Sequence, residues 1–193
     1  NAQFLLFLTA VIEAVDDYQD LLRVAIASAG NDHRLGANEA PPAIISIFLG
    51  EELNAVIESI VNESAYQSRE RVQMRLGVHV LPRFPKDTTD RNRTSPFAFT
   101  GNKFEFRSLG SAQSISGPNV VLNTIIAESL SKIADELESA SDFTAALNTM
   151  IRRVLRGHKR IIFNGNGYDP AWVDEAEKRG LLNMRTTVDA LPS

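Results

Sequence analysis

Residues 101–140 read GNKFEFRSLGSAQSISGPNVVLNTIIAESLSKIADELESA, and this stretch decides the fold class. Its segment Phe104-Glu105-Phe106-Arg107 alternates apolar and charged side chains with period two, which is typical of a half-buried strand. After Ser116-Gly117-Pro118-Asn119 the apolar residues recur at helical spacing to about Ala140. A strand followed at once by a long helix predicts an α+β chain.

Outward from this stretch, helical spacing dominates. Helices are expected over residues 4–24, 51–66, 142–155 and 170–179, loops over 31–42 and 86–102, a turn over 164–167 and a partly alternating strand over 72–80. Residues 44–49 could form a strand or begin a buried helix. Asp169, Pro170 and Gly180 stand where an N-cap, a first helical residue and a residue past the C-terminus belong. The pattern therefore predicts a helix-rich α+β fold.

Composition excludes several classes of protein. The chain has 193 residues, 44% of them hydrophobic, with 20 Lys+Arg against 24 Asp+Glu and a net charge of −4. This is ordinary for a soluble globular protein and lacks the basic excess of a nucleic-acid binder. Zero Cys excludes disulfides, a Cys nucleophile and a thiolate zinc site, and fits a reducing, cytoplasmic compartment. No apolar run reaches the roughly 18 residues of a membrane span.

The start of the chain suggests that it is cut from a longer protein. It begins without Met, and an amphipathic helix is expected almost at once. The apolar run 4–15 lacks the basic region of a signal peptide, so we reject that interpretation.

Basic residues concentrate in residues 81–107. Within this window are six bases and three acids: Arg83, Lys86, Arg91, Arg93, Lys103 and Arg107 against Asp87, Asp90 and Glu105. A strand would place Lys103, Glu105 and Arg107 on one face, and a carboxylate between cations suits a site where a metal meets anionic ligands. The alternative is a solvated edge strand with ion pairs, which the pattern alone favours about twofold.

The loop 31–42 is the second candidate site. It contains His33, Arg34 and Glu39, which suit anion binding and proton transfer, although a plain surface loop is favoured about three to one. The three histidines show no metal-binding spacing, and no phosphate-loop, dinucleotide-binding or nucleophile-elbow motif occurs. The basic residues of 152–160 are interpreted as the end of a helix, where positive charges interact favourably with the helix dipole.

Three segments, in order, resemble glutamine synthetases. HRLGANEAP, residues 33–41, looks like the family's glutamate-binding flap K-R-L-x-P-G-Y-E-A-P. RNRTS, residues 91–95, looks like its phosphate-binding R-N-R-S-A, and KFEFR, residues 103–107, like its metal and substrate strand R-L-E-x-R. The flap GANEAPP and the segment NGNGY resemble the large bacterial type III enzymes in particular, and the resemblance covers almost the whole chain.

The resemblance implies a fold and a domain organisation. Residues 1–193 would be the C-terminal part of a glutamine synthetase catalytic domain, with antiparallel half-barrel strands packed against helices. About 50–85 would be a type-specific insertion, and about 141–193 a C-terminal helical region.

The resemblance also implies roles for six residues. Glu39 and Arg93 would be catalytic, Arg34 and Arg107 would bind glutamate, Arg93 and Lys103 would bind the nucleotide, and Glu105 would ligate the metal. Two departures affect the nucleotide contacts: Ala98 or its neighbours stand where the family has a second Arg, and Lys103 replaces an Arg.

The implied reaction is the ATP-dependent ligation of ammonia to glutamate through γ-glutamyl phosphate, with Mg²⁺ or Mn²⁺. The implied assembly is a cytoplasmic homo-oligomer, a ring or double ring, without nucleic-acid or membrane partners. The remaining metal ligands would lie upstream, so the 193 residues alone are expected to be inactive. Two alternatives stay open: a related γ-glutamyl-amine ligase, and a non-catalytic oligomerisation or regulatory module.

Overall fold

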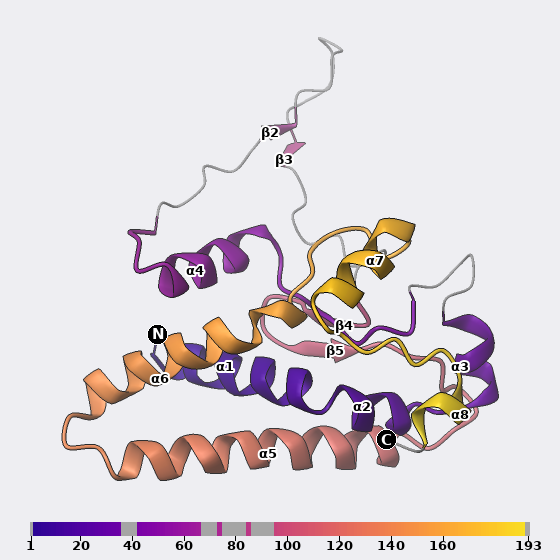
Figure 1. Cartoon of the computed structure of the whole chain (residues 1–193), viewed down its shortest axis with the longest axis horizontal. Coiled ribbons are helices and arrows are strands. Elements are labelled where there is room, and N and C mark those ends of the chain that lie inside the picture. The colour runs from indigo at the N-terminus through magenta and orange to yellow at the C-terminus, as the bar shows by residue number, and fades with distance from the viewer. Residues whose placement is uncertain (1, 36–41, 67–72, 75–83, 86–94, 192–193) are drawn as a thin grey trace.

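A computed structural model describes residues 2–35, 42–66, 73–74, 84–85 and 95–191 (Figure 1). The helices are α1 Ala2–Asp17, α2 Gln19–Ala25, α3 Ala29–Arg34, α4 Glu51–Val61, α5 Ser116–Glu138, α6 Phe143–His158, α7 Pro170–Lys178 and α8 Thr187–Ala190, with a short 3-10 helix η1 at Lys159–Ile161. The strands are β1 Ile47–Phe48, β2 Gln73–Met74, β3 Phe84–Pro85, β4 Phe97–Phe99 and β5 Phe104–Phe106. The predicted helix-rich α+β class is confirmed.

The central sheet has the order β1-β4-β5 and is mixed rather than wholly antiparallel. β4 runs antiparallel to β5, with Phe97 opposite Phe106, whereas β1 lies parallel to β4, with Ile47 opposite Phe97. Gly101 adopts φ +95° between β4 and β5, which confirms the turn expected there and favours glycine. Strand β2 pairs antiparallel with β3 in a separate sheet and lies within the strand expected over 72–80.

Strand β4 corrects the prediction of a loop over 86–102. Phe97 and Ala98 are buried, and Phe97 packs against the rings of Phe104 and Phe106 at centroid distances of 5.3 and 5.8 Å. Strand β4 reads Phe97-Ala98-Phe99 and has no polar residue, so it does not alternate between apolar and polar side chains. Strand β4 is buried because β1 and β5 pair with it on either side, and the sequence of β4 alone does not indicate these partners.

Helix α1 packs against both α5 and α6, which run alongside it (Figure 1). The single helix expected over 4–24 is in fact two, separated at Tyr18. Asp142 caps α6 by accepting a hydrogen bond from the Ala145 backbone N–H at 3.0 Å. No helix in the described part of the chain is long and apolar enough to cross a membrane.

The C-terminal segment joins the sheet through Phe163 and Asn164. The Phe163 backbone N–H donates to the Ile47 carbonyl at 2.8 Å, and the Phe163 ring stacks on Trp172 of α7 at 3.6 Å. The Asn164 Oδ1 accepts hydrogen bonds from the backbone N–H groups of Leu49 and Gly50, both at 2.9 Å. The turn at 164–167 therefore has a structural role. Helix α7 begins at Pro170 as predicted and ends at Lys178, one residue before the expected end.

Two other expected helices have different ends. Helix α4 ends at Val61 instead of residue 66, and α6 continues to His158 beyond the expected residue 155. The basic residues at the end of α6 form ion pairs with other elements: Arg153 with Glu136 of α5, Lys159 with Glu58 of α4 at 3.1 Å, and Arg160 with Asp16 of α1 at 3.0 Å.

Candidate functional site

Lys103, Glu105 and Arg107 lie on one face of β5, as the alternation predicted. The Lys103 Nζ lies 3.6 Å from one Glu105 carboxylate oxygen, and the Arg107 Nη2 donates to the other at 3.1 Å. The Glu105 and Arg107 side chains are 30% exposed and Lys103 is 66% exposed. The face can therefore present a carboxylate and two cations to a ligand.

The opposite face of β5 is apolar. Phe104 and Phe106 pack against the core together with Phe97. They also line a cavity of about 430 Å³ between β5, α2 and the start of α5. None of the described candidate residues Arg34, Lys103, Glu105 and Arg107 lines this cavity.

Arg34 lies on a helix, which corrects the prediction of a loop from residue 31. Helix α3 begins after Ser28, whose Oγ accepts a hydrogen bond from the Asn31 backbone N–H at 3.2 Å. This cap stabilises a six-residue helix despite the poor helix propensity of Gly30. Arg34 is exposed in the last turn of α3.

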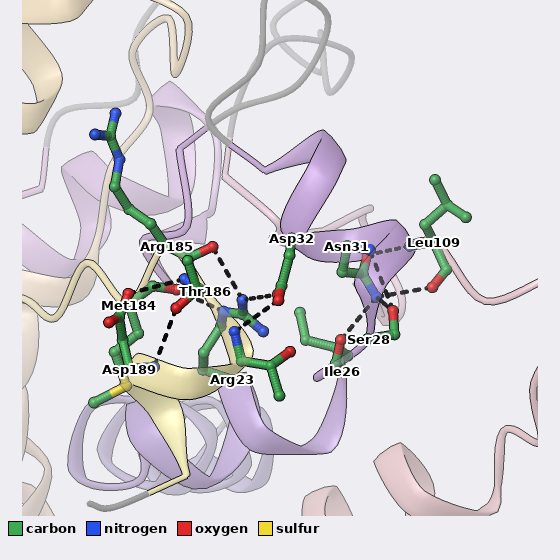
Figure 2. Close-up of polar contacts among 11 residues, drawn as sticks. Arg23, Ile26, Ser28, Asn31, Asp32, Leu109, Met184, Arg185, Thr186 and Asp189 are labelled. Atoms are coloured by element: carbon green, nitrogen blue, oxygen red, sulfur yellow. Dashed lines mark hydrogen bonds and ion pairs between the residues drawn. The ribbon is translucent and has the colours of Figure 1, made fainter.

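Asn31 connects α3 to the segment that follows β5 (Figure 2). Its Nδ2 donates to the Leu109 carbonyl at 2.9 Å, and its Oδ1 accepts from the Leu109 backbone N–H at 2.8 Å. The buried side chain thus pairs with one backbone residue as a neighbouring strand would. The helix that carries Arg34 is therefore anchored two residues beyond Arg107.

The other two candidates, Glu39 and Arg93, lie outside the described residues. The described part of the RNRTS segment is its last residue, Ser95, which is buried at the start of β4. The Ser46 Oγ donates to the Ser95 Oγ at 2.7 Å, and the Ser95 Oγ donates to the Phe163 carbonyl at 3.0 Å. This end of the segment is thereby fixed to β1 and to the C-terminal part of the chain.

Glu105 can supply one ligand to a divalent cation. Its carboxylate oxygens are the type that Mg²⁺ and Mn²⁺ prefer, and the remaining positions need other oxygen ligands or water. A second group of acids, Glu13 and Asp17 with His158, has potential ligand atoms within 4.8 Å of one another. Its members already have partners on α1, α5 and α6, so we interpret this group as an ion-pair cluster.

Arg23, Asn31 and Asp32 were not predicted from the sequence. Arg23 and Asn31 are buried and Asp32 is partly buried. Their hydrogen bonds hold α3, which carries Arg34, in place. A buried Arg amid helical residues has no local pattern of its own, because its partners lie about 160 residues away in the sequence.

The chain is similar in sequence to known glutamine synthetases. The glutamine synthetase C-terminal domain matches residues 146–193. The chain is 55% identical over 99% of its length to the type-3 glutamine synthetase of Dictyostelium discoideum. It is 47% identical over 100% of its length to a glutamine synthetase of Butyrivibrio fibrisolvens, and 43% identical over 99% to one of Bacteroides fragilis. The alignments cover 26%, 27% and 27% of these relatives, so the chain spans about a quarter of their length.

Proposed function

We propose that the chain belongs to the glutamine synthetase family and forms part of the catalytic domain of a type III enzyme that ligates ammonia to glutamate with ATP. The observation that carries the proposal is the charged face of β5 beside the anchored helix α3. Arg107 donates two hydrogen bonds to Glu105 on this face. Arg34 is exposed on α3, and Asn31 of the same helix bonds Leu109, two residues beyond Arg107. Arg34, Glu105 and Arg107 correspond to residues of the family's motifs, whereas Lys103 replaces an Arg.

The reaction has two steps. The γ-carboxylate of glutamate attacks the γ-phosphorus of ATP, and ADP leaves, which gives γ-glutamyl phosphate. Ammonia then attacks the acyl carbon, phosphate leaves and glutamine forms. The first step brings two anions together, so the site needs positive charge around the transferring group.

The residues of this chain would supply much of that charge. Arg34 would hold a glutamate carboxylate, and Arg107 would position the carboxylate that attacks, because a guanidinium matches a carboxylate with two hydrogen bonds. Arg93 would stabilise the phosphoryl group, and Glu39 would accept a proton from ammonium. Glu105 would hold a Mg²⁺ or Mn²⁺ ion, which when bound offsets the charge of the ATP phosphates.

Lys103 would contact the nucleotide as a point charge. Its ammonium group is more exposed than its neighbours and lies 3.6 Å from Glu105. It cannot make the two parallel hydrogen bonds of an Arg at this position. Contacts to the nucleotide phosphates are therefore expected to differ from those in the common family pattern.

A substrate panel on the full-length enzyme tests the proposal. Glutamate, ATP and Mg²⁺ with ammonia should yield glutamine, ADP and phosphate in equal amounts. A product formed only with larger amines would identify a γ-glutamyl-amine ligase instead. A full-length protein that turns over no ATP with any amine would support the non-catalytic module.

The assembly and location belong to the same proposal. We expect a cytoplasmic homo-oligomer, a ring or double ring, without nucleic-acid or membrane partners. The region about 50–85 would be a type-specific insertion, and its helix α4 has an outer side that could form an oligomer contact. The region about 141–193 would be the C-terminal helical part. Mass measurement of the full-length protein and of a variant with Glu51→Lys and Glu52→Lys tests the contact, since both side chains are exposed on α4.

A further inference from the structure

Arg23 is buried where α2, α3 and the segment before α8 meet (Figure 2). Its side chain is 1% exposed. Its Nε donates to the Met184 carbonyl at 2.7 Å, and its Nη2 donates to the Asp32 carboxylate at 2.7 Å and to the Arg185 carbonyl at 3.3 Å. A buried guanidinium is costly unless it is paired, so these contacts favour one fixed arrangement of the three segments.

Asp32 completes the connection with its second oxygen. Its Oδ2 accepts a hydrogen bond at 2.8 Å from the backbone N–H of Thr187, the first residue of α8. Burial alone would raise the pKa of the Asp32 carboxyl, but the hydrogen bonds from Thr187 and Arg23 outweigh it and lower that pKa. The carboxylate therefore stays ionised and joins α3 to both α2 and α8.

Helix α3 is thus held on two sides. Asn31 fastens it to Leu109 beyond β5, and the next residue, Asp32, fastens it to Arg23 and Thr187. Successive residues of a helix point about 100° apart, so these two attachments resist both rotation and sliding of α3. Arg34 follows Asp32 by two residues and is exposed at the free end of this helix.

We propose that Arg23, Asp32 and the segment 184–187 are positioning elements that fix Arg34 for glutamate binding. This inference rests on the proposed function, in which Arg34 holds a glutamate carboxylate. It makes the C-terminal segment part of the machinery that sets glutamate affinity, although its residues need not touch the substrate.

Replacing Thr187 by Pro in the full-length enzyme tests this arrangement with little other change. Proline is well suited to the first position of a helix, and Thr186 before it is extended at φ −118° and ψ 159°, which proline tolerates. Thr187→Pro therefore removes the N–H that binds Asp32, whereas the matched Thr187→Ala keeps it. We expect Thr187→Pro to raise the KM for glutamate about tenfold, as for one lost hydrogen bond to a charged group, with kcat and the KM for ATP changed less than about twofold.

Three further variants separate positioning from general stability. Asp32→Asn should raise the KM for glutamate in the same way, and it decides the question if Thr187→Pro does not fold. Val154→Ala, a core change in α6, should lower the melting temperature without altering that KM. In an Arg34→Ala background, Thr187→Pro should have no additional effect on the KM.

The outcomes distinguish the two proposals. A wild-type enzyme that makes no glutamine would overturn the proposed function. An active wild type whose KM for glutamate is unchanged by Thr187→Pro and Asp32→Asn would overturn the positioning role alone. Equal increases in the KM for glutamate and for ATP, or full additivity with Arg34→Ala, would also overturn it.

Discussion

Glu105 pairs with the flexible ammonium group of Lys103 on one side and with the planar guanidinium of Arg107 on the other. Removing the carboxylate would remove the proposed metal ligand and would leave Lys103 and Arg107 without their shared counter-charge. Lys103→Arg keeps the positive charge on the strand and restores a guanidinium. The consequences of the two changes should therefore be very different.

We predict that Glu105→Ala in the full-length enzyme lowers kcat/KM for Mg-ATP about 100-fold or more, because metal-assisted charge stabilisation is lost. Lys103→Arg should change it less than about threefold. Steady-state kinetics over a range of Mg²⁺ concentrations measure both, and added Mg²⁺ should restore part of the Glu105→Ala activity at subsaturating metal. Equal and small effects of the two substitutions would contradict the assignment of Glu105.

His158 should give the stability of the protein a pH dependence of known sign. Its Nδ1 lies 2.9 Å from an Asp16 carboxylate oxygen and 3.6 Å from Asp17, and the hydrogen bond to Asp16 raises its pKa although burial opposes the shift. Asp16 also pairs with Arg160. A histidine with a raised pKa in the folded state stabilises that state fully below its unfolded pKa of about 6.5, and the contribution is lost as the pH rises through the folded pKa.

We therefore expect His158→Gln to lower the free energy of unfolding more at pH 5.5 than at pH 9. Urea denaturation at the two pH values measures the difference. Asp17→Asn serves as a control, because its more exposed carboxylate should produce a smaller change at pH 5.5. An equal loss of stability at both pH values for His158→Gln would show that the imidazolium contributes nothing.

At the scale of elements, Gly165 in the turn after Phe163 leaves room for the Phe163 ring to stack on Trp172. A Cβ on Gly165 would lie 2.7 Å from the Phe163 ring, which itself stacks on Trp172. Gly157 in α6 offers a matched contrast, since a Cβ there meets nothing within 4 Å. The same substitution should therefore have opposite effects at the two glycines.

We predict that Gly165→Ala destabilises the protein by about 1–3 kcal/mol through displacement of the Phe163 ring. Gly157→Ala should stabilise it by about 0.5–1 kcal/mol, because alanine loses less conformational entropy in a helix. Thermal unfolding and the near-ultraviolet signal of the single tryptophan measure both effects. A stabilising Gly165→Ala would mean that the ring moves aside freely.

Elements with strong local signals were predictable, and those held by distant contacts were not. Helices α5, α6 and α7 and strand β5 follow from periodicity, from the Asp142 and Asp169 caps and from alternation. Strand β4, helix α3 and the break at Tyr18 carry little pattern of their own. Their conformations depend on strands and side chains that pack against them from elsewhere in the chain.

The same division applies to the candidate site. The alternation of β5 correctly predicted that Lys103, Glu105 and Arg107 share a face. The roles of these residues and of Arg34 come from the family resemblance and stay predictions. The supports Arg23 and Asn31 could not be predicted, since their partners Met184 and Leu109 are separated from them by 161 and 78 residues. A sequence pattern thus indicates which groups meet a ligand, whereas the structure shows what holds those groups in place.

At the scale of the whole molecule, the chain contains only part of what the proposed reaction requires. It spans about a quarter of the length of its relatives. Among the described residues that match the family's motifs, Glu105 is the one carboxylate assigned to the metal, and a bound Mg²⁺ needs several further oxygen ligands in near-octahedral geometry. The core that joins α1, α5 and α6 is nevertheless extensive and includes Ile12 and Leu155.

We predict that the 193 residues expressed alone contain folded helices but make no glutamine from glutamate, ammonia, ATP and Mg²⁺. Circular dichroism should show cooperative loss of helix on heating. That result would exclude misfolding as the cause of the inactivity. The full-length enzyme assayed in parallel provides the positive control. ATP- and glutamate-dependent synthesis by the isolated chain would mean that its own residues complete the metal and nucleotide sites, and the proposed division of the active site would be wrong.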